Sequence, residues 1–227
     1  MTALLRGPRS AARSVPVPRL FAPSLLVLLA LAGCTRSREV VAPPNAERPS
    51  DNWRSLVTDD DRNRVRRWRN AWTEALAQAQ PANAAAIARE GPLLDPDAAL
   101  PGARLPAGDY RCRTIKLGAQ SAGHAVFTAY EPRPCRVGAE GTRLHFTIFD
   151  GPQRPIGTFF PDIGGRRMIF LGTLQFGDEA LAYRYSWDRE RDMVGLLERI
   201  GDHRWRLVFP HPHFESLLDV IELVPNR

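Results

Sequence analysis

The feature that most constrains this chain is a series of short alternating segments in its second half. Between residues 108 and 224, apolar residues recur at every second position, and turn signals such as Gly151-Pro152 and Gly201-Asp202 separate the segments. A period of two is typical of strands that bury one face. Strands at this spacing form a meander that hides its edges by closing on itself. The sequence therefore predicts an antiparallel, barrel-like sheet of about 8–10 strands.

Segments rich in aromatic and β-branched residues are predicted as strands. They are Asp109–Leu117, Ala125–Tyr130, Cys135–Val137, Arg143–Phe149, Ile156–Phe160, Met168–Phe176, Ala180–Trp187, Met193–Ile200, Arg204–Phe209 and Leu217–Val224. Their aromatic residues are expected either to fill the barrel or to line a cavity for an apolar ligand. The residues expected inside are Phe127, Phe146, Phe159, Phe170, Tyr183, Tyr185, Trp187 and Trp205.

The segment before the strands has a helical period. Between residues 53 and 79, apolar residues recur every three or four positions, and Thr58 precedes three aspartates that suit the first turn of a helix. Pro81 is expected to end this helix, and a shorter one is expected to end at Gly91. Residues 53–91 thus predict a helical hairpin packed on the sheet, which makes the fold class α+β.

The first 33 residues have the pattern of an export signal. Four arginines without an acidic residue precede an apolar run over residues 20–32, which is shorter than the ~20 residues needed to span a bilayer. The run ends in Leu31-Ala32-Gly33-Cys34, which resembles the lipobox of bacterial lipoproteins. That resemblance implies cleavage before Cys34 and acylation of this residue with diacylglycerol and a further chain such as palmitate. An ordinary signal peptide with a chance cysteine is the alternative.

Three parts of the chain are predicted from this pattern. They are a signal peptide over residues 1–33, a proline-rich tether over 34–52 and a single domain over 53–227, with the barrel-like part at 108–224. Thr35, not aspartate, follows the cysteine, so we expect the periplasmic face of the outer membrane. Outside the leader, basic and acidic residues nearly balance, and Lys116 is the only lysine. This balance gives no support for nucleic-acid binding.

The remaining two cysteines are predicted to form a disulfide. With Cys34 assigned to lipid, Cys112 and Cys135 are left as a pair in an oxidising compartment. Closing the loop between them stabilises the fold by about 3–4 kcal/mol in the chain-entropy account. Metal ligation by the two thiols is the alternative.

Arginines supply the candidate ligand-binding site. Arg111 and Arg113 share one side of the first strand, and Arg204 and Arg206 share one side of a late strand. First and last strands meet in a barrel, so these four guanidiniums are expected to form a patch that suits phosphate or carboxylate. The alternative is a solvated outer face on which the arginines pair with Glu179, Glu198 or Glu222. No catalytic residue, cofactor or metal site is predicted, and His211-Pro212-His213 lacks a third ligand nearby apart from Glu215.

Several motifs together resemble a known family. They are GDYRCRTIKLG at 108–118, GPQRPIGTFFPD at 151–162, FLGT at 170–173 and ERIGDHRWRLVFPHPHFES at 198–216. They are similar to domain-of-unknown-function family 4893 of alphaproteobacterial lipoproteins, which implies no activity. Gly108-x-Tyr110 is more loosely similar to the Gly-x-Trp opening of lipocalin-like barrels, from which Tyr110 departs.

These observations favour a non-enzymatic binding module for an acidic or amphipathic envelope component. The alternative is a protein–protein interaction module, such as an inhibitor of lysozyme or of a protease, that inserts residues 118–134 into its partner. An enzyme of unknown class is third, because no motif reveals a cluster of ionisable groups. The expected partners are the membrane, through the lipid anchor, and an envelope ligand or a periplasmic protein.

Overall fold

The computed structural model describes residues 51–226. The predicted signal peptide, the acylated Cys34 and nearly all of the tether lie outside the described residues, so these assignments stay predictions. Among the helices of residues 51–226, none has the length and apolar character needed to cross a membrane.

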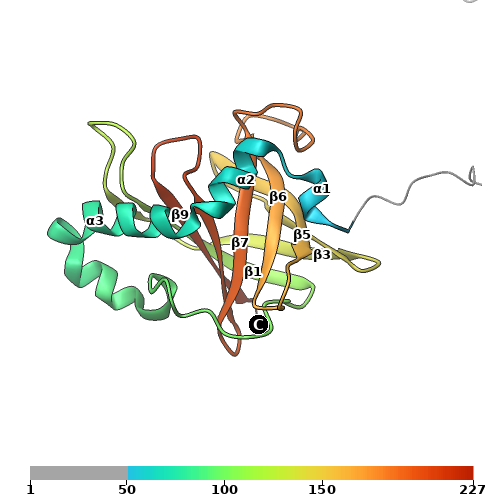
Figure 1. The fold of residues 1–227 in the computed structure, drawn as a ribbon, viewed down its shortest axis with the longest axis horizontal. Coiled ribbons are helices and arrows are strands. Elements are labelled where there is room, and N and C mark those ends of the chain that lie inside the picture. Colours follow the sequence, from blue (N-terminus) through green and yellow to red (C-terminus); the bar gives the residue numbers. More distant parts are fainter. Residues whose placement is uncertain (1–50, 227) are drawn as a thin grey trace, which may run out of the picture. The chain divides into compact units, whose positions relative to one another are not determined.

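The second half of the chain is one antiparallel sheet that closes on itself (Figure 1). Its strands are β1 (Gly108–Leu117), β2 (Phe127–Ala129), β3 (Arg133–Glu140), β4 (Arg143–Ile148), β5 (Gln153–Pro161), β6 (Arg167–Phe176), β7 (Asp192–Gly201), β8 (Arg204–Pro210) and β9 (Leu218–Pro225). β1 pairs with β9, which closes the barrel. β2 and β3 pair with successive halves of the same edge of β1, so the wall has eight strand positions in meander order.

The helices precede the barrel and cover part of its outer surface. They are α1 (Trp53–Leu56), α2 (Asp59–Arg66), α3 (Trp68–Glu90) and the short 3₁₀ helix η1 (Gly91–Leu93). Thr58 caps α2 as predicted, because its Oγ1 accepts a hydrogen bond from the Asp61 amide at 3.3 Å. The helical hairpin is present: α3 turns back on itself in Figure 1, and Gly91 ends it with φ 53°.

The two predicted helices are present within α3, but the break between them falls at Asn83 rather than at Pro81. Asn83 has non-helical geometry with φ −132°, and helical geometry resumes up to Glu90. The Asn83 side-chain amide donates to the carbonyl of Ala79 at 3.1 Å, four residues earlier. A proline two residues before the break removes a backbone donor and favours a kink there.

Aromatic rings fill the middle of the barrel. Phe146, Phe159, Phe170 and Phe209 contact one another with ring centroids 5.5–6.1 Å apart. The Phe170 ring lies over a cross-strand glycine pair, Gly157 and Gly172, where a Cβ atom would collide with it. The barrel is therefore solid at this level.

Two further apolar clusters lie outside the barrel wall. α3, with the fully buried Trp72, packs on β1, β8 and β9. Trp53 and Val57 cover β6 and β7, where they meet residues such as Ile169 and Val194. β6 is consequently buried on both faces, which explains its nearly continuous apolar sequence.

One end of the barrel is sealed by the chain that leads into it. Ala103 and Leu105 are 1% exposed and belong to the interior cluster. The amides of Gly102 and Ala103 both donate to the Gly165 carbonyl in the β5–β6 turn. We call this the closed end. The opposite end, the mouth, is surrounded by the loops 118–126, 149–152, 177–191 and 211–217.

The strand predicted at Ala180–Trp187 is absent. β6 and β7 pair directly with each other, so no strand edge is available, and residues 177–191 form the β6–β7 loop. Tyr183 and Trp187 are 47% and 73% exposed there, so their predicted interior position is wrong. Phe127 is also outside the barrel, packed against the α3 cluster.

Candidate ligand site at the barrel mouth

The only lysine of the chain lies inside the mouth. Residues alternate along β1, so Thr114 and Lys116 follow Tyr110 and Cys112 on its inner side. Lys116 Nζ is 3.0 Å from Asp219 Oδ2 and 3.3 Å from a carboxylate oxygen of Glu215. The lysine is only 7% exposed. A charged side chain at this depth is stable because it is paired.

Neighbouring groups hold the two carboxylates in place. The Ser216 hydroxyl donates to the other oxygen of Asp219. Gln153 Nε2 approaches Glu215 at 3.5 Å, and Glu215 adopts φ 67°, a left-handed conformation unusual for glutamate. That backbone geometry places its carboxylate beside Lys116.

The acidic neighbours set the charge of Lys116. Burial acts to lower the pKa of Lys116, but Asp219 and Glu215 outweigh it and raise the pKa, so the side chain stays an ammonium. Burial raises the pKa of Asp219, and Lys116 and Ser216 oppose this effect. The lysine is already paired with two acidic side chains and does not form a site for a free anion.

Two cavities meet at Lys116. The inner one, of about 50 Å³, has an apolar floor that includes Phe209 and Ile221. The outer one, of about 230 Å³, opens between Tyr130, Ile148 and neighbouring loop residues. Thr114, Lys116 and Gln153 line both cavities. The inner cavity has room for a few waters or a small polar group, and the outer one for a short apolar chain.

A buried polar cluster under α2 fixes the β6–β7 loop. Tyr185 Oη donates to Asp61 Oδ2 at 2.5 Å and accepts from the Thr58 amide at 3.1 Å. Asp192 Oδ1 accepts from the Ser186 amide at 2.8 Å. Burial raises the pKa of Asp192, and burial followed by the Asp61 charge raises that of Tyr185. These bonds hold the loop against the barrel rim.

The four predicted arginines lie on the same side of the sheet, but β9 separates the pair on β1 from the pair on β8. Glu222 of β9 binds Arg113 at 3.0 Å and Arg204 at 2.6 Å. Arg113 also forms an ion pair with Glu90 at the end of α3. Arg111 is exposed at another position, where it lines a shallow hollow near the C-terminus.

Arg206 is 0% exposed and serves the fold. Its guanidinium binds Glu198 at 2.7 Å, lies 5.0 Å from the Trp72 ring and donates to carbonyl groups of residues 92–96. The arginines pair with Glu198 and Glu222 as the alternative expected. The expected solvated face is wrong for Arg206, which η1 and the following residues cover. Anion binding by these arginines stays a prediction. Three of the four already form ion pairs with glutamates of the chain itself, which would compete with an added anion.

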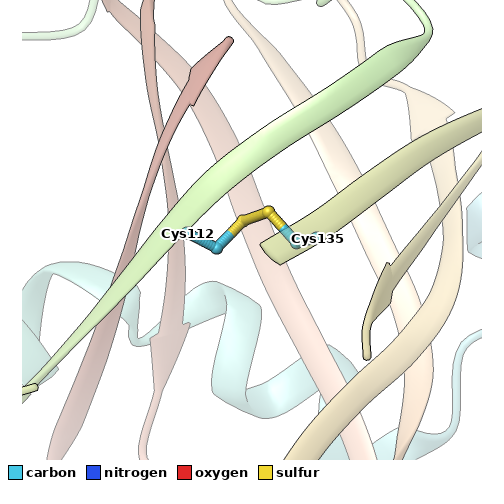
Figure 2. Close-up of a disulfide and its surroundings, with 2 residues drawn as sticks. All are labelled: Cys112 and Cys135. Atoms are coloured by element: carbon cyan, nitrogen blue, oxygen red, sulfur yellow. A yellow bond between two sulfur atoms is a disulfide. The ribbon is translucent and has the colours of Figure 1, made fainter. Parts of the chain in front are cut away.

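The predicted disulfide between Cys112 and Cys135 is present (Figure 2). Their Cα atoms are 5.9 Å apart, and the bond joins β1 to β3 on the inner side of the barrel. It lies near the point where β1 passes from pairing with β3 to pairing with β2. The bond therefore fixes the start of the wall beside the outer cavity.

The two histidines of the β8–β9 loop do not assemble a metal site. Burial lowers the pKa of both His211 and His213, which favours the neutral imidazole. Within residues 51–226, no group of three or more histidine, cysteine, aspartate or glutamate side chains is placed to hold a metal ion.

Sequence reasoning missed the cluster around Lys116. Its signal was present: Lys116 shares its side of the strand with Cys112, and Asp219 interrupts the apolar run of the last strand. Charged residues at inward positions of a barrel mark a polar interior. The β1–β9 pairing that brings these two residues together is not visible in either segment alone.

The fold and the site together define a class: an eight-stranded antiparallel barrel, consistent with a lipocalin-like fold, with helices outside and a polar mouth. The chain belongs to the family described as Domain of unknown function (DUF4893), whose model matches residues 53–223. The predicted membership of this family is thus confirmed. No curated protein and no solved structure matches the chain.

Proposed function

We propose that the protein is a non-enzymatic binding module that holds a small amphipathic molecule at the barrel mouth. The observation that carries the proposal is the meeting of two cavities at a buried, hydrogen-bonded cluster around Lys116. Binding sites of this kind combine apolar walls with a few fixed polar groups. The polar group of the ligand would bind near Lys116 and Glu215, and its apolar part would occupy the outer cavity.

The charges favour a neutral or cationic polar group over an acidic one. Lys116 is bound to Asp219 and Glu215, and the Glu215 side chain remains 44% exposed. A carboxylate ligand would meet this second negative charge, whereas a hydroxyl or ammonium group would donate a hydrogen bond to it. The amphipathic form of the hypothesis is therefore favoured over the acidic form.

We also propose that the protein works at the cell envelope. The leader, the acylated Cys34 and the tether would attach the domain to the periplasmic face of the outer membrane. The disulfide supports an oxidising compartment, because such bonds persist outside the cytosol.

The other two hypotheses receive less support. Ser216 is 1% exposed and bonded to Asp219, so its hydroxyl is not available to attack a substrate. For an inhibitor that inserts residues 118–134, β2 ties the middle of that segment to β1. Only the part of this segment outside β2 could insert into a partner, and inhibition by that part stays a prediction.

Binding of N-phenyl-1-naphthylamine, a neutral fluorescent amphiphile, tests the proposal. We expect saturable fluorescence enhancement, with displacement by dodecylamine or dodecanol at lower concentration than by dodecanoate. Gln153→Trp should weaken binding at least tenfold, because it fills the junction of both cavities. Ile163→Trp, at the closed end, is the matched control and should bind normally. No saturable binding, or equal binding by both variants, would refute the proposal.

A further inference from the structure

Exposed apolar side chains gather at the mouth. Among residues 51–226, four of the eight large apolar side chains with high exposure lie on the loops of this end. They are Phe149, Leu181, Tyr183 and Trp187, and a fifth, Tyr130, lines the outer cavity. Scattered exposed residues need no explanation, but a group on one rim marks an interaction surface.

The β6–β7 loop, residues 177–191, carries the most exposed members of this group. Leu181 is 84% and Trp187 73% exposed. Figure 1 shows the loop, in orange, projecting beyond β6 and β7 at the end away from the C-terminus. Its apolar side chains therefore project beyond the barrel wall.

The loop presents these side chains in a fixed conformation. Tyr185 is bound to Asp61 and Thr58, whereas Tyr183 and Trp187 on either side of it are exposed. Ser186 adopts φ 71° and is held by Asp192. A surface that is already ordered loses little conformational entropy on binding.

The loop carries charges of both signs, which suit a zwitterionic headgroup layer. The exposed Arg184 and Arg189 flank Trp187 in the sequence, and the exposed Asp178 and Glu190 lie near the two ends of the loop. The acidic Asp188 is bound to Arg191 at 3.2 Å. Tryptophan and tyrosine favour the membrane interface, where arginine reaches lipid phosphates while its stem stays on apolar surface.

The chain outside the described residues is long enough for such a contact. Residues 35–52 separate the predicted lipid anchor at Cys34 from α1. A flexible tether of this length has a root-mean-square reach of about 20–25 Å and a limit of about 60 Å. An acylated Cys34 would therefore keep the domain close enough to the bilayer for its surface to contact the lipid.

We propose that the β6–β7 loop rests on the surface of a phospholipid bilayer, with Leu181 and Trp187 at the level of the headgroups. The mouth of the barrel then faces the lipid, so an amphipathic ligand can pass between bilayer and cavity. The inference rests on the proposed attachment to the envelope. It does not depend on which ligand the cavity holds.

Quenching of tryptophan fluorescence by brominated phosphatidylcholine tests the contact. The full acylated protein is reconstituted in vesicles of phosphatidylcholine with and without bromine on the acyl chains. Trp53, Trp72 and Trp205 are at most 6% exposed, and the partly exposed Trp68 lies beside the β5–β6 turn at the closed end, so Trp187 should give most of the quenched signal. We expect bromolipid to quench part of the emission and Trp187→Phe to abolish most of that quenching.

A matched pair of variants separates this loop from apolar exposure in general. Leu181→Ser should reduce the quenching at least twofold, whereas Ile163→Ser, at a residue 83% exposed at the closed end, should not change it. Flotation with the vesicles confirms that the anchor is intact. If the protein floats with the vesicles but bromolipid does not quench its emission, the contact is refuted. Acrylamide in the buffer quenches tryptophan that is open to water. If Trp187 stays open to acrylamide on vesicles and is protected only by an added protein, the contact is also refuted. Binding of N-phenyl-1-naphthylamine in solution remains a separate test of the cavity.

Discussion

Replacing Arg206 with methionine tests whether the arginine face serves the fold. The substitution keeps an unbranched apolar stem but removes the guanidinium with its charge and all its donors. Glu198, itself 1% exposed, then loses one of its two arginine partners and keeps Arg167 at 2.6 Å. The carbonyl groups of residues 92–96 lose their shared donor as well.

The expected loss is large for one substitution. Removing one partner of a buried ion pair costs about 3–5 kcal/mol, and we expect the lower part of that range because Arg167 remains. For a domain of this size, each kcal/mol corresponds to about 2–4 °C in Tm. Arg206→Met should therefore lower Tm by roughly 6–15 °C.

Urea unfolding followed by circular dichroism measures the effect. The midpoint should fall while the slope stays unchanged, since the unfolded chain exposes the same surface. Arg204→Met is the matched control: its side chain is 32% exposed and Glu222 keeps Arg113, so the loss should stay below about 1 kcal/mol. If Arg206→Met does not fold, Arg206→Lys keeps the charge and should give an intermediate loss. Equal, small losses for the variants at both positions would refute the structural role.

Three further outcomes follow from the packing and the buried groups. Reducing the disulfide, or replacing Cys112 and Cys135 with serine, should lower the free energy of unfolding by about 3 kcal/mol. An unchanged free energy of unfolding would contradict a stabilising role for this bond. Gly157→Ala should cost about 1–3 kcal/mol, because the new methyl lies 2.6 Å from the neighbouring strand, whereas Gly138→Ala meets nothing within 4 Å and should change stability by less than about 0.5 kcal/mol. Burial lowers the folded-state pKa of His213, so the unfolded chain binds the proton more tightly and stability should fall as the pH drops below 6.5. His213→Gln should weaken this pH dependence of Tm in thermal unfolding. An unchanged dependence of Tm on pH would contradict the prediction.

The barrel was predictable because its determinants are local. Period-two alternation and turn residues specify strands that pair with their neighbours in sequence, and β4 follows the pattern closely. Ala180–Trp187 has the same alternation without a partner strand. Alternation would place Tyr183, Tyr185 and Trp187 on one face, but the turns of this loop, with Ser186 at φ 71°, break that pattern. Tyr185 is anchored to α2, whereas Tyr183 and Trp187 are exposed. Alternation indicates two faces but does not say what each face contacts.

The sites depend on contacts between distant parts of the chain, and these were less predictable. Arg206 is on the outer side of its strand as expected, but residues 92–96 return to cover it. Lys116 is 103 residues from Asp219 and meets it only because the barrel closes between β1 and β9. The spacing of Lys116 from Cys112 was enough to predict that its side chain lies on the inner side of the strand. Its partners could be identified only from the pairing of β1 with β9.

Photoaffinity labelling tests the central claim, that the mouth is the ligand site, most directly. A diazirine-bearing dodecylamine is bound to the protein, photolysed and located by mass spectrometry of the digested chain. The account predicts labels in residues 148–153 and 212–215, which border the two cavities, and competition by unlabelled dodecylamine. Labels confined to the closed end or to the helices, or labels that resist competition, would contradict it.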